Sequence, residues 1–171
     1  MEKLKFAVLG CGFWSKFQIG AWSELEGAEL VAIYNRTLSK ARQIADYFKI
    51  PRVYDDPHQL FEKEKLDFVD IITDVGTHAY FVEMAVNNGI KHVICQKPMA
   101  PDFETAKKMV SLCNNSGVKL YIHENYRWQA PVRRFKRIMD SGVIGKKFKP
   151  SRGILAIKSI ICLWWSSIRC R

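Results

Sequence analysis

Apolar residues along the first part of the chain follow two alternating patterns, one typical of strands and the other of helices. Residues 5–9 form a short apolar run that stops at Gly10, as in a strand buried on both faces. The residues that follow repeat apolar positions at helical spacing, at Phe17, Ala21, Trp22 and Leu25. Gly27 then has the place of a helix C-terminal glycine. The pattern therefore predicts a strand and then a helix that ends near Gly27.

This alternation continues to Gly142. Further strands are predicted over residues 29–34, 52–54, 67–72, 91–95 and 118–122. Further helices are predicted over residues 38–49, after Asp56 as a cap, and over 77–88, 102–115 and 131–142. Short apolar strands that alternate with helices are typical of a parallel sheet with helices on both faces. The sequence therefore predicts a doubly wound α/β fold.

Composition and charge narrow the class of protein. The chain has 171 residues, of which 48% are hydrophobic and 26% charged, as in an ordinary globular domain. The net charge is +10, but residues 149–171 contain five basic residues and no acidic one, so half of the excess lies there. In the remaining body, basic and acidic residues are interspersed, which is more typical of a solvated surface than of a phosphate-binding face. We therefore expect no nucleic-acid partner, and no aromatic platform beside the basic residues of the helix predicted over 131–142.

The five cysteines suggest neither a disulfide framework nor a metal site. Their number is odd and no two form a CxxC pair; they are Cys11, Cys95, Cys113, Cys162 and Cys170. The N-terminal residues lack the apolar stretch and cleavage site of a secretory signal. We therefore expect reduced thiols, no bound metal and a cytoplasmic protein.

A glycine-rich loop stands where the first predicted strand turns into the first helix. It reads Gly10, Cys11, Gly12, Phe13, Trp14 and Ser15. Gly10 permits the tight turn, Gly12 lets the backbone approach a pyrophosphate, and the N–H groups of the helix start can bind an anion. Ser15 replaces the usual third glycine with another small residue. Residues 10–15 are therefore predicted to bind a dinucleotide; the alternative is a turn with no ligand.

The end of the second predicted strand bears on the choice of coenzyme. A carboxylate that accepts the ribose hydroxyls of NAD normally stands about 20 residues after the glycine motif. Asn35 stands there instead, followed by Arg36 and Thr37. An amide does not repel a 2′-phosphate, and the planar, charged guanidinium of an arginine can bind that phosphate. The sequence therefore favours NADP over NAD, with the alternative that Arg36 is a surface charge and Thr37 a helix cap.

Three later segments resemble motifs of the Gfo/Idh/MocA family of NAD(P)-dependent oxidoreductases. Residues 93–98 resemble its Glu-Lys-Pro signature after a buried strand, with Gln96 in place of the glutamate. Residues 73–78 resemble its Thr-Pro-Asn-x-x-His loop, and residues 125–128 its Asn-x-Arg-aromatic segment. Together with the glycine loop, the resemblance spans about residues 4–148 and implies a Rossmann domain over residues 1–148.

The resemblance implies roles for individual residues. Lys97 matches the signature lysine beside the nicotinamide and the substrate, where a lowered pKa would let it exchange a proton with a substrate hydroxyl. Pro98 matches a cis-proline that orients this lysine toward the site. The other residues implied at the cofactor site are Thr73, His78, Gln96, Asn125 and Arg127, with His123 at the pocket edge. The implied reaction is hydride transfer between nicotinamide and a hydroxyl-bearing carbon of a sugar-like or polyol substrate.

The end of the chain departs from the family. Its members carry a second α/β domain with an Asp-x-x-x-His pair, whereas the last histidine here is His123. Residues 149–171 form a basic, apolar tail that suggests a frameshifted or truncated reading frame, with self-association through the tail as an expectation. The alternatives are a genuine short variant and attachment to a membrane surface, since the apolar run is too short to span a bilayer. Two functions stay open: an oxidoreductase impaired by the loss of its second domain, or a non-catalytic dinucleotide-binding module.

Overall fold

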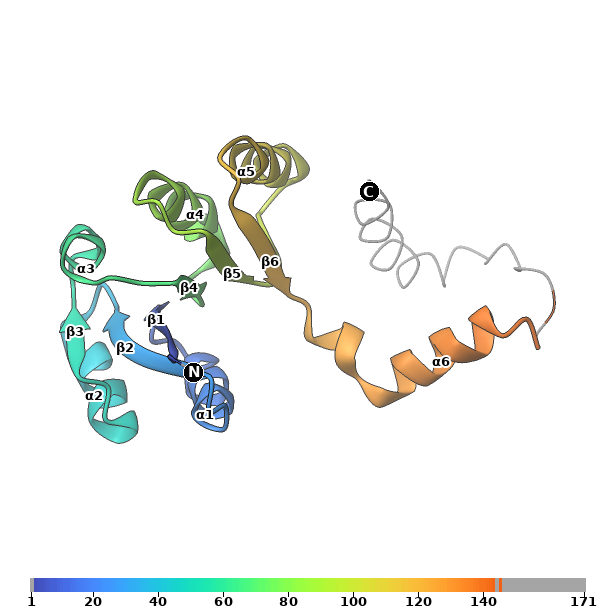
Figure 1. Cartoon of the computed structure of the whole chain (residues 1–171), viewed down its shortest axis with the longest axis horizontal. Helices are drawn as coiled ribbons and strands as arrows, with labels where there is room; N and C mark the ends of the chain where they lie inside the picture. Colours follow the sequence, from blue (N-terminus) through green and yellow to red (C-terminus); the bar gives the residue numbers. More distant parts are fainter. Residues whose placement is uncertain (1, 144, 146–171) are drawn as a thin grey trace. The chain divides into compact units, whose positions relative to one another are not determined.

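Six short strands form one parallel sheet in the order β3-β2-β1-β4-β5-β6 (Figure 1). The strands are β1 (Leu4–Leu9), β2 (Ala28–Tyr34), β3 (Arg52–Tyr54), β4 (Phe68–Ile71), β5 (His92–Gln96) and β6 (Lys119–His123). The helices between them are α1 (Ser15–Ser23), α2 (Leu38–Phe48), α3 (Pro57–Lys63), η1 (Val75–Thr77), α4 (His78–Asn87) and α5 (Phe103–Asn115). The predicted doubly wound α/β fold is confirmed.

The structure is a computed structural model that describes residues 2–143 and 145. The chain divides into two units, Met1–Glu124 and Asn125–Arg171. The sheet belongs to the first unit, and the second contains η2 (Asn125–Trp128) and α6 (Ala130–Asp140). The predicted domain over residues 1–148 therefore extends beyond the sheet unit, and the predicted tail over residues 149–171 lies outside the described residues.

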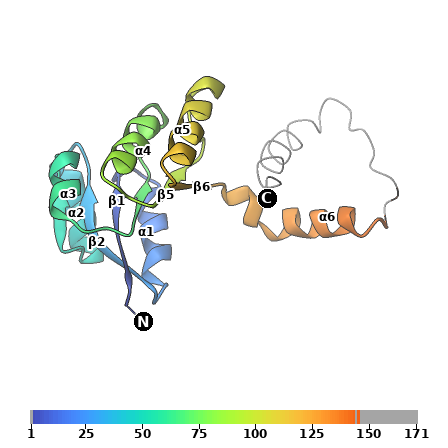
Figure 2. The same ribbon diagram turned by 45° about the horizontal axis from the view of Figure 1, so that its top comes forward.

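Each face of the sheet packs under its own helices. Phe6 and Val8 of β1 belong to a cluster that includes Ile19 of α1, whereas Ala7 and Leu9 point to the opposite face and pack in the cluster under α3, α4 and α5. Figures 1 and 2 show these two layers of helices. Burial of both faces explains why the strands are nearly all apolar, and each large buried side chain contributes about 1.5–3 kcal/mol.

The first helix differs from its prediction in its buried face and in its end. Its buried residues are Ser15, Gln18 and Ile19, whereas Phe17 is 59% exposed. The helix ends at Ser23, and Gly27 lies beyond it, where its carbonyl accepts a hydrogen bond from Leu4 at the start of β1. Of the predicted apolar face, only Trp22 packs on the core, whereas the other three positions are exposed, and the predicted C-terminal glycine was wrong. Gln18 is buried because it has polar partners inside the protein.

Most other element boundaries agree with the sequence prediction to within two residues. Asp56 caps α3 as predicted, since its carboxylate accepts a hydrogen bond from the His58 N–H at 2.9 Å and Pro57 occupies the first turn. Asp102 caps α5 in the same way through Thr105. Within the described part of the chain, no helix is both long and apolar enough to cross a membrane.

Substitution of Gly10 tests the close packing of this residue against the backbone after β4. Its φ is +112°, and an added Cβ would lie 2.8 Å from the Ile72 carbonyl carbon and oxygen. We expect Gly10→Ala to lower the free energy of unfolding by at least about 2 kcal/mol, because neither backbone can give way. Gly20→Ala on α1 is the matched control: a Cβ there meets nothing within 4 Å and should raise helix stability by about 1 kcal/mol. Denaturant unfolding followed by circular dichroism measures both, and a Gly10→Ala protein of wild-type stability would contradict the structure.

Candidate functional site

The carboxyl ends of the strands lie together at one edge of the sheet, because all six strands are parallel. The strand order reverses at β1, which has β2 on one side and β4 on the other. In doubly wound sheets, ligands bind in the crevice outside the carboxyl ends at such a switch point. The segments that follow β1, β2, β4 and β5 begin at Gly10, Asn35, Ile72 and Lys97. The fold therefore gathers most of the predicted site residues at this edge.

Hydrogen bonds hold the glycine loop from several directions. The Gly10 N–H donates to the Tyr34 carbonyl at 2.8 Å, and the buried Ser15 hydroxyl donates to the Gly12 carbonyl at 2.6 Å. Gly12 itself is exposed, and nothing lies within 4 Å of where its Cβ would be. The loop is therefore fixed at its two ends and open at Gly12, where the sequence predicted the approach of a pyrophosphate.

The side chain of Asn35 is used inside the protein. Its Oδ1 accepts a hydrogen bond from the Cys11 N–H at 3.0 Å, and its Nδ2 donates to the Thr37 carbonyl at 3.0 Å. The sequence placed this residue against the ribose, but the structure adds that its amide shapes the glycine loop. Arg36 and Thr37 are exposed beside it, and the Thr37 side chain caps no N–H of α2.

Three aromatic rings lie exposed beside the loop. Phe13 is 78% exposed and Trp14 is 40% exposed. The Phe17 ring centroid lies 5.3 Å from that of Phe13 and 5.5 Å from that of Trp14. Contact of Phe13 and Trp14 with a cofactor stays a prediction, and the structure adds Phe17 to the same surface.

The strand end that carries Lys97 has a defined backbone geometry. The Lys97–Pro98 peptide bond is cis, which confirms the implied cis-proline. The Lys97 N–H donates to Oε1 of the preceding Gln96 side chain at 2.8 Å. Gln96 is buried and Lys97 is half-buried. The side chain at position 96 therefore holds the backbone of the lysine, and a catalytic role for Lys97 stays a prediction.

His78 joins two loops of the site. It is 1% exposed, with Nδ1 3.0 Å from the Pro98 carbonyl oxygen and Nε2 3.2 Å from that of Thr73. The Thr73 hydroxyl accepts a hydrogen bond from Thr77 at 2.8 Å. Direct cofactor contact by His78 stays a prediction, but the described geometry assigns its ring to the interior, between the end of β4 and the loop after Lys97, where a neutral imidazole can donate to one of the two carbonyls.

Sequence reasoning missed a buried polar cluster below this edge. Asp70 of β4 is fully buried and accepts hydrogen bonds from Gln18 and from the indole N–H of Trp22. Burial raises the pKa of Asp70, and the hydrogen bonds from Trp22 and Gln18 and the nearby His123 oppose that rise. The sequence offered one signal for this cluster, namely that the carboxylate Asp70 lies inside the apolar run of residues 67–72. In the described part of the chain, no group of three or more metal-ligating side chains occurs.

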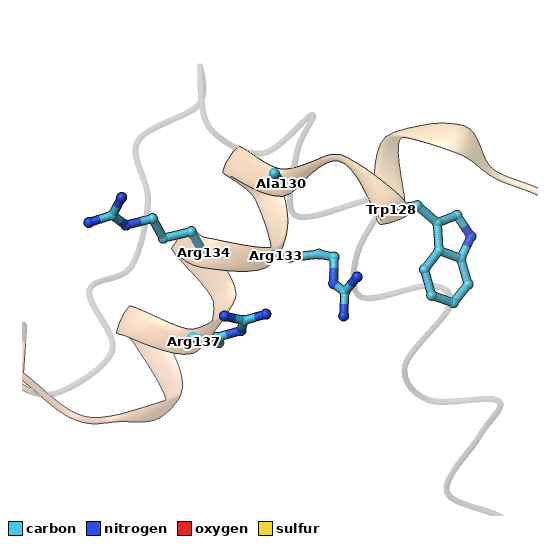
Figure 3. A pocket seen from close by; sticks show the side chains of 5 residues that line it. All are labelled: Trp128, Ala130, Arg133, Arg134 and Arg137. Carbon is cyan, nitrogen blue, oxygen red and sulfur yellow. The ribbon is translucent and has the colours of Figure 1, made fainter.

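The second unit contains the remaining predicted residues, Asn125 and Arg127, whose place at the site stays a prediction. The Arg127 guanidinium lies 5.5 Å from the Trp128 ring centroid. A hollow is lined by Trp128, Ala130, Arg133, Arg134 and Arg137 (Figure 3). Trp128 is the aromatic side chain of this hollow, and one ring outside α6 is no platform interleaved with the basic residues of the helix. The expectation of no nucleic-acid partner stays a prediction.

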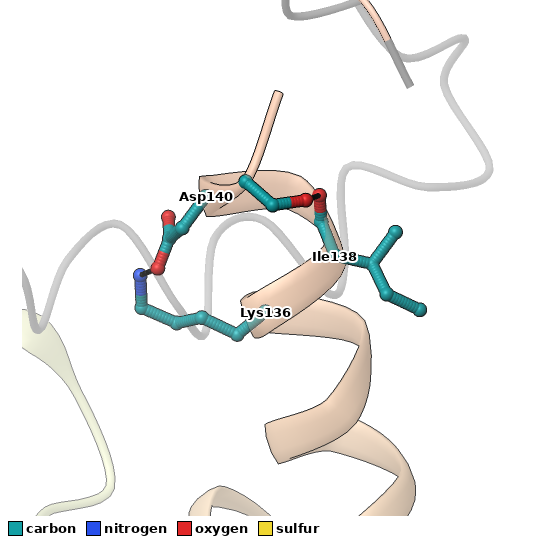
Figure 4. Close-up of polar contacts among 4 residues, drawn as sticks. Lys136, Ile138 and Asp140 are labelled. Carbon is teal, nitrogen blue, oxygen red and sulfur yellow. Dashed lines mark hydrogen bonds and ion pairs between the residues drawn. The ribbon is translucent and has the colours of Figure 1, made fainter. Parts of the chain in front are cut away.

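One basic residue of the same helix is paired with an acid. Lys136 and Asp140 of α6 form an ion pair one turn apart, and the Ser141 hydroxyl donates to the Ile138 carbonyl near the helix end (Figure 4). An exposed pair at this spacing contributes only about 0.3–0.5 kcal/mol. The ion pair therefore adds little to the stability of α6.

Comparison with known proteins identifies the family. Residues 4–124 match the sequence model of an oxidoreductase family with an NAD-binding Rossmann fold. The chain belongs to the Gfo/Idh/MocA family. This membership confirms the resemblance that its strand-end motifs suggested.

Individual Gfo/Idh/MocA proteins are similar over most of this chain. D-apiose dehydrogenase of Rhizobium rhizogenes is 42% identical over 148 residues, which is 86% of this chain and 43% of the relative. An oxidoreductase from Agrobacterium radiobacter, solved with NAD+, L-tartaric acid and magnesium, is 42% identical with a TM-score of 0.81, over 85% of this chain and 42% of that one. The WlbA dehydrogenase of Bordetella pertussis, solved with NADH and UDP-GlcNAcA, is 27% identical with a TM-score of 0.77, over 82% and 43%. This chain spans about two fifths of the length of these relatives.

The cysteines near the site provide a test of its packing. Burial raises the pKa of both the Cys11 and the Cys95 thiol to about 12. At pH 8 only on the order of one thiol in ten thousand would be the reactive thiolate. We expect iodoacetamide to leave both residues unmodified in the folded protein and to alkylate both in guanidinium chloride, as read by peptide mass spectrometry. Rapid alkylation of Cys11 in the folded protein would show that the loop is not packed as described.

Proposed function

We propose that this chain binds a nicotinamide dinucleotide, with a preference for NADP, across the carboxyl edge of the sheet. The observation that carries the proposal is the contrast within the glycine loop. Gly10 is pressed against the backbone after β4, whereas the space next to Gly12 is open. No protein atom would obstruct a Cβ at position 12, so packing within the fold does not explain the glycine there. A ligand that lies against the backbone at this position would explain it.

The residues around the loop fit such a ligand. N–H groups at the start of a helix suit an anion such as the pyrophosphate, and the positive end of the α1 dipole favours its charge. Among the N–H groups at the start of α1, that of Ser15 already donates to the Gly12 carbonyl at 3.2 Å. Arg36 and Thr37 are exposed next to Asn35, whose own amide is already bonded to the loop. A guanidinium and a hydroxyl suit a 2′-phosphate, which is why we favour NADP.

We propose further that the chain takes part in sugar or polyol oxidation and reduction, as its relatives' names suggest. A bound nicotinamide would supply the group that accepts or gives up a hydride. The half-buried Lys97 would hold or release a proton at Nζ, next to the substrate hydroxyl. Because the chain spans about two fifths of its relatives, the reaction and its substrate are proposals, as is a cytoplasmic location.

Substitution of Gly12 tests the site directly. We expect Gly12→Ala to weaken NADPH binding at least about tenfold, because the added methyl group occupies the space for the pyrophosphate. Its Tm should stay within about 2 °C of the wild type, since a Cβ there meets no atom within 4 Å. Fluorescence titration with NADPH and thermal unfolding give the two values. Gly20→Ala is the control with unchanged affinity, and wild-type affinity in Gly12→Ala would overturn the proposed site.

Coenzyme preference depends on Arg36 in this proposal. We expect Arg36→Ala to weaken NADPH binding by about tenfold or more, the cost of charge-assisted hydrogen bonds worth about 1.5–3 kcal/mol, and to leave NADH binding within about twofold. Arg42→Ala, at an exposed position on α2, is the matched control. An equal loss for both coenzymes, or no loss for either, would contradict the assignment of Arg36 to a 2′-phosphate.

A further inference from the structure

The buried carboxylate of Asp70 fixes the orientation of one amide. Nε2 of Gln18 lies 2.8 and 2.7 Å from the two carboxylate oxygens of Asp70, and the Trp22 indole N–H donates to one of them at 2.7 Å. The three hydrogen bonds from Gln18 and Trp22 all donate to Asp70, which suits an ionised carboxylate because that form only accepts, and they oppose the rise in its pKa that burial causes. The Gln18 side chain must therefore turn its nitrogen to Asp70 and its oxygen to the other side.

The amide oxygen of Gln18 contacts residues at the ends of β5 and β6. Oε1 of Gln18 accepts a hydrogen bond from Nε2 of Gln96 at 2.9 Å and lies 3.0 Å from Nδ1 of His123. Gln96 and His123 are register partners on β5 and β6. Because a carbonyl oxygen only accepts, the proton of neutral His123 must be on Nδ1. Gln96 then uses its own oxygen to hold the Lys97 N–H.

We propose that Asp70 and Gln18 are positioning residues for the strand end that carries Lys97, and that residue 96 is glutamine because Asp70 already occupies the amide nitrogen of Gln18. The proposal rests on the proposed function of Lys97 at the nicotinamide site. Only the oxygen of Gln18 is left for position 96, so that position must donate. An amide donates through its nitrogen, whereas the ionised glutamate of the family signature would face the oxygen without a proton.

The Gln18 amide is expected to adopt the opposite orientation when the groups at positions 70 and 96 are exchanged. In the Asp70→Asn variant, the new amide nitrogen can donate to Gln18, which is then free to turn over. Gln18 can then donate to the carboxylate that Gln96→Glu introduces and to Nδ1 of His123. The wild-type pair and the double variant are therefore both compatible with Gln18, whereas Gln96→Glu alone places two carboxylates around one amide.

The first measurement is the tautomer of His123 in the wild-type protein without cofactor. Long-range 1H–15N NMR at about pH 8.5, above the usual pKa of imidazole, shows which ring nitrogen carries the proton. The signal is assigned by its loss in His123→Gln. We expect the Nδ1–H tautomer. Neutral His123 with its proton on Nε2 would overturn the proposed polarity, whatever the variants do.

The second measurement is a double-mutant cycle on Tm at pH 8. We expect Gln96→Glu to lower Tm by several degrees in the wild-type background and by clearly less in Asp70→Asn. The His123 tautomer should invert only in the double variant. Gln59→Glu with Asp46→Asn makes the same chemical changes at exposed positions on α3 and α2, and should show no coupling. Additive losses together with an unchanged tautomer would overturn the proposal.

The third measurement tests the link to Lys97. Gln18→Leu releases Gln96, so amide hydrogen exchange at Lys97 should become several-fold faster relative to core amides such as Val69. Gln43→Leu, at an exposed position on α2, should leave the ratio unchanged. An unchanged ratio in Gln18→Leu would contradict the positioning role. None of these measurements needs a coenzyme, so their failure and a failure of NADPH binding are distinguishable.

Discussion

The close approach of Gly10 to the backbone after β4 is the contact on which the strand-end edge depends. β1 and β4 are neighbours where the strand order reverses, and only a residue without a Cβ can pass Ile72 at this distance. The approach brings the chain over the sheet edge and leaves Gly12 facing open space. Asn35 and Ser15 then hold the loop through Cys11 and Gly12. A single steric constraint thus distinguishes Gly10, which the packing requires, from Gly12, which we propose lies against the coenzyme.

Some polar side chains at the strand-end edge contact other parts of the protein, whereas others are accessible to solvent. The amide of Asn35 bonds to the glycine loop and so links it to the end of β2, and the buried His78 ring lies between the end of β4 and the loop after Lys97. Arg36 is exposed and Lys97 is half-buried, and these are the side chains that we propose contact the coenzyme and substrate. Rigid surroundings of this kind reduce the cost of orienting a bound molecule.

The sequence predicted the sheet and nearly all of its helices because both faces of the central strands are buried, so that these strands are recognisable as apolar runs. It failed on α1, where Phe17 is exposed and Gln18 is buried, because the partner of Gln18 is Asp70, 52 positions away, and periodicity carries no information about such a contact. The site was predictable to the level of the strand ends. The use of the Asn35 amide by Cys11 was not, since that bond joins segments 24 residues apart.

The strand-end edge is proposed to bind a nicotinamide dinucleotide across the carboxyl ends of β1, β2, β4 and β5. Amide chemical-shift mapping of the 15N-labelled chain during NADPH titration tests it most directly. We expect saturable shifts at residues 10–15, 35–37, 73 and 96–97, with the far ends of the strands unchanged. Shifts confined to α6, or none at coenzyme concentrations in the millimolar range, would contradict it.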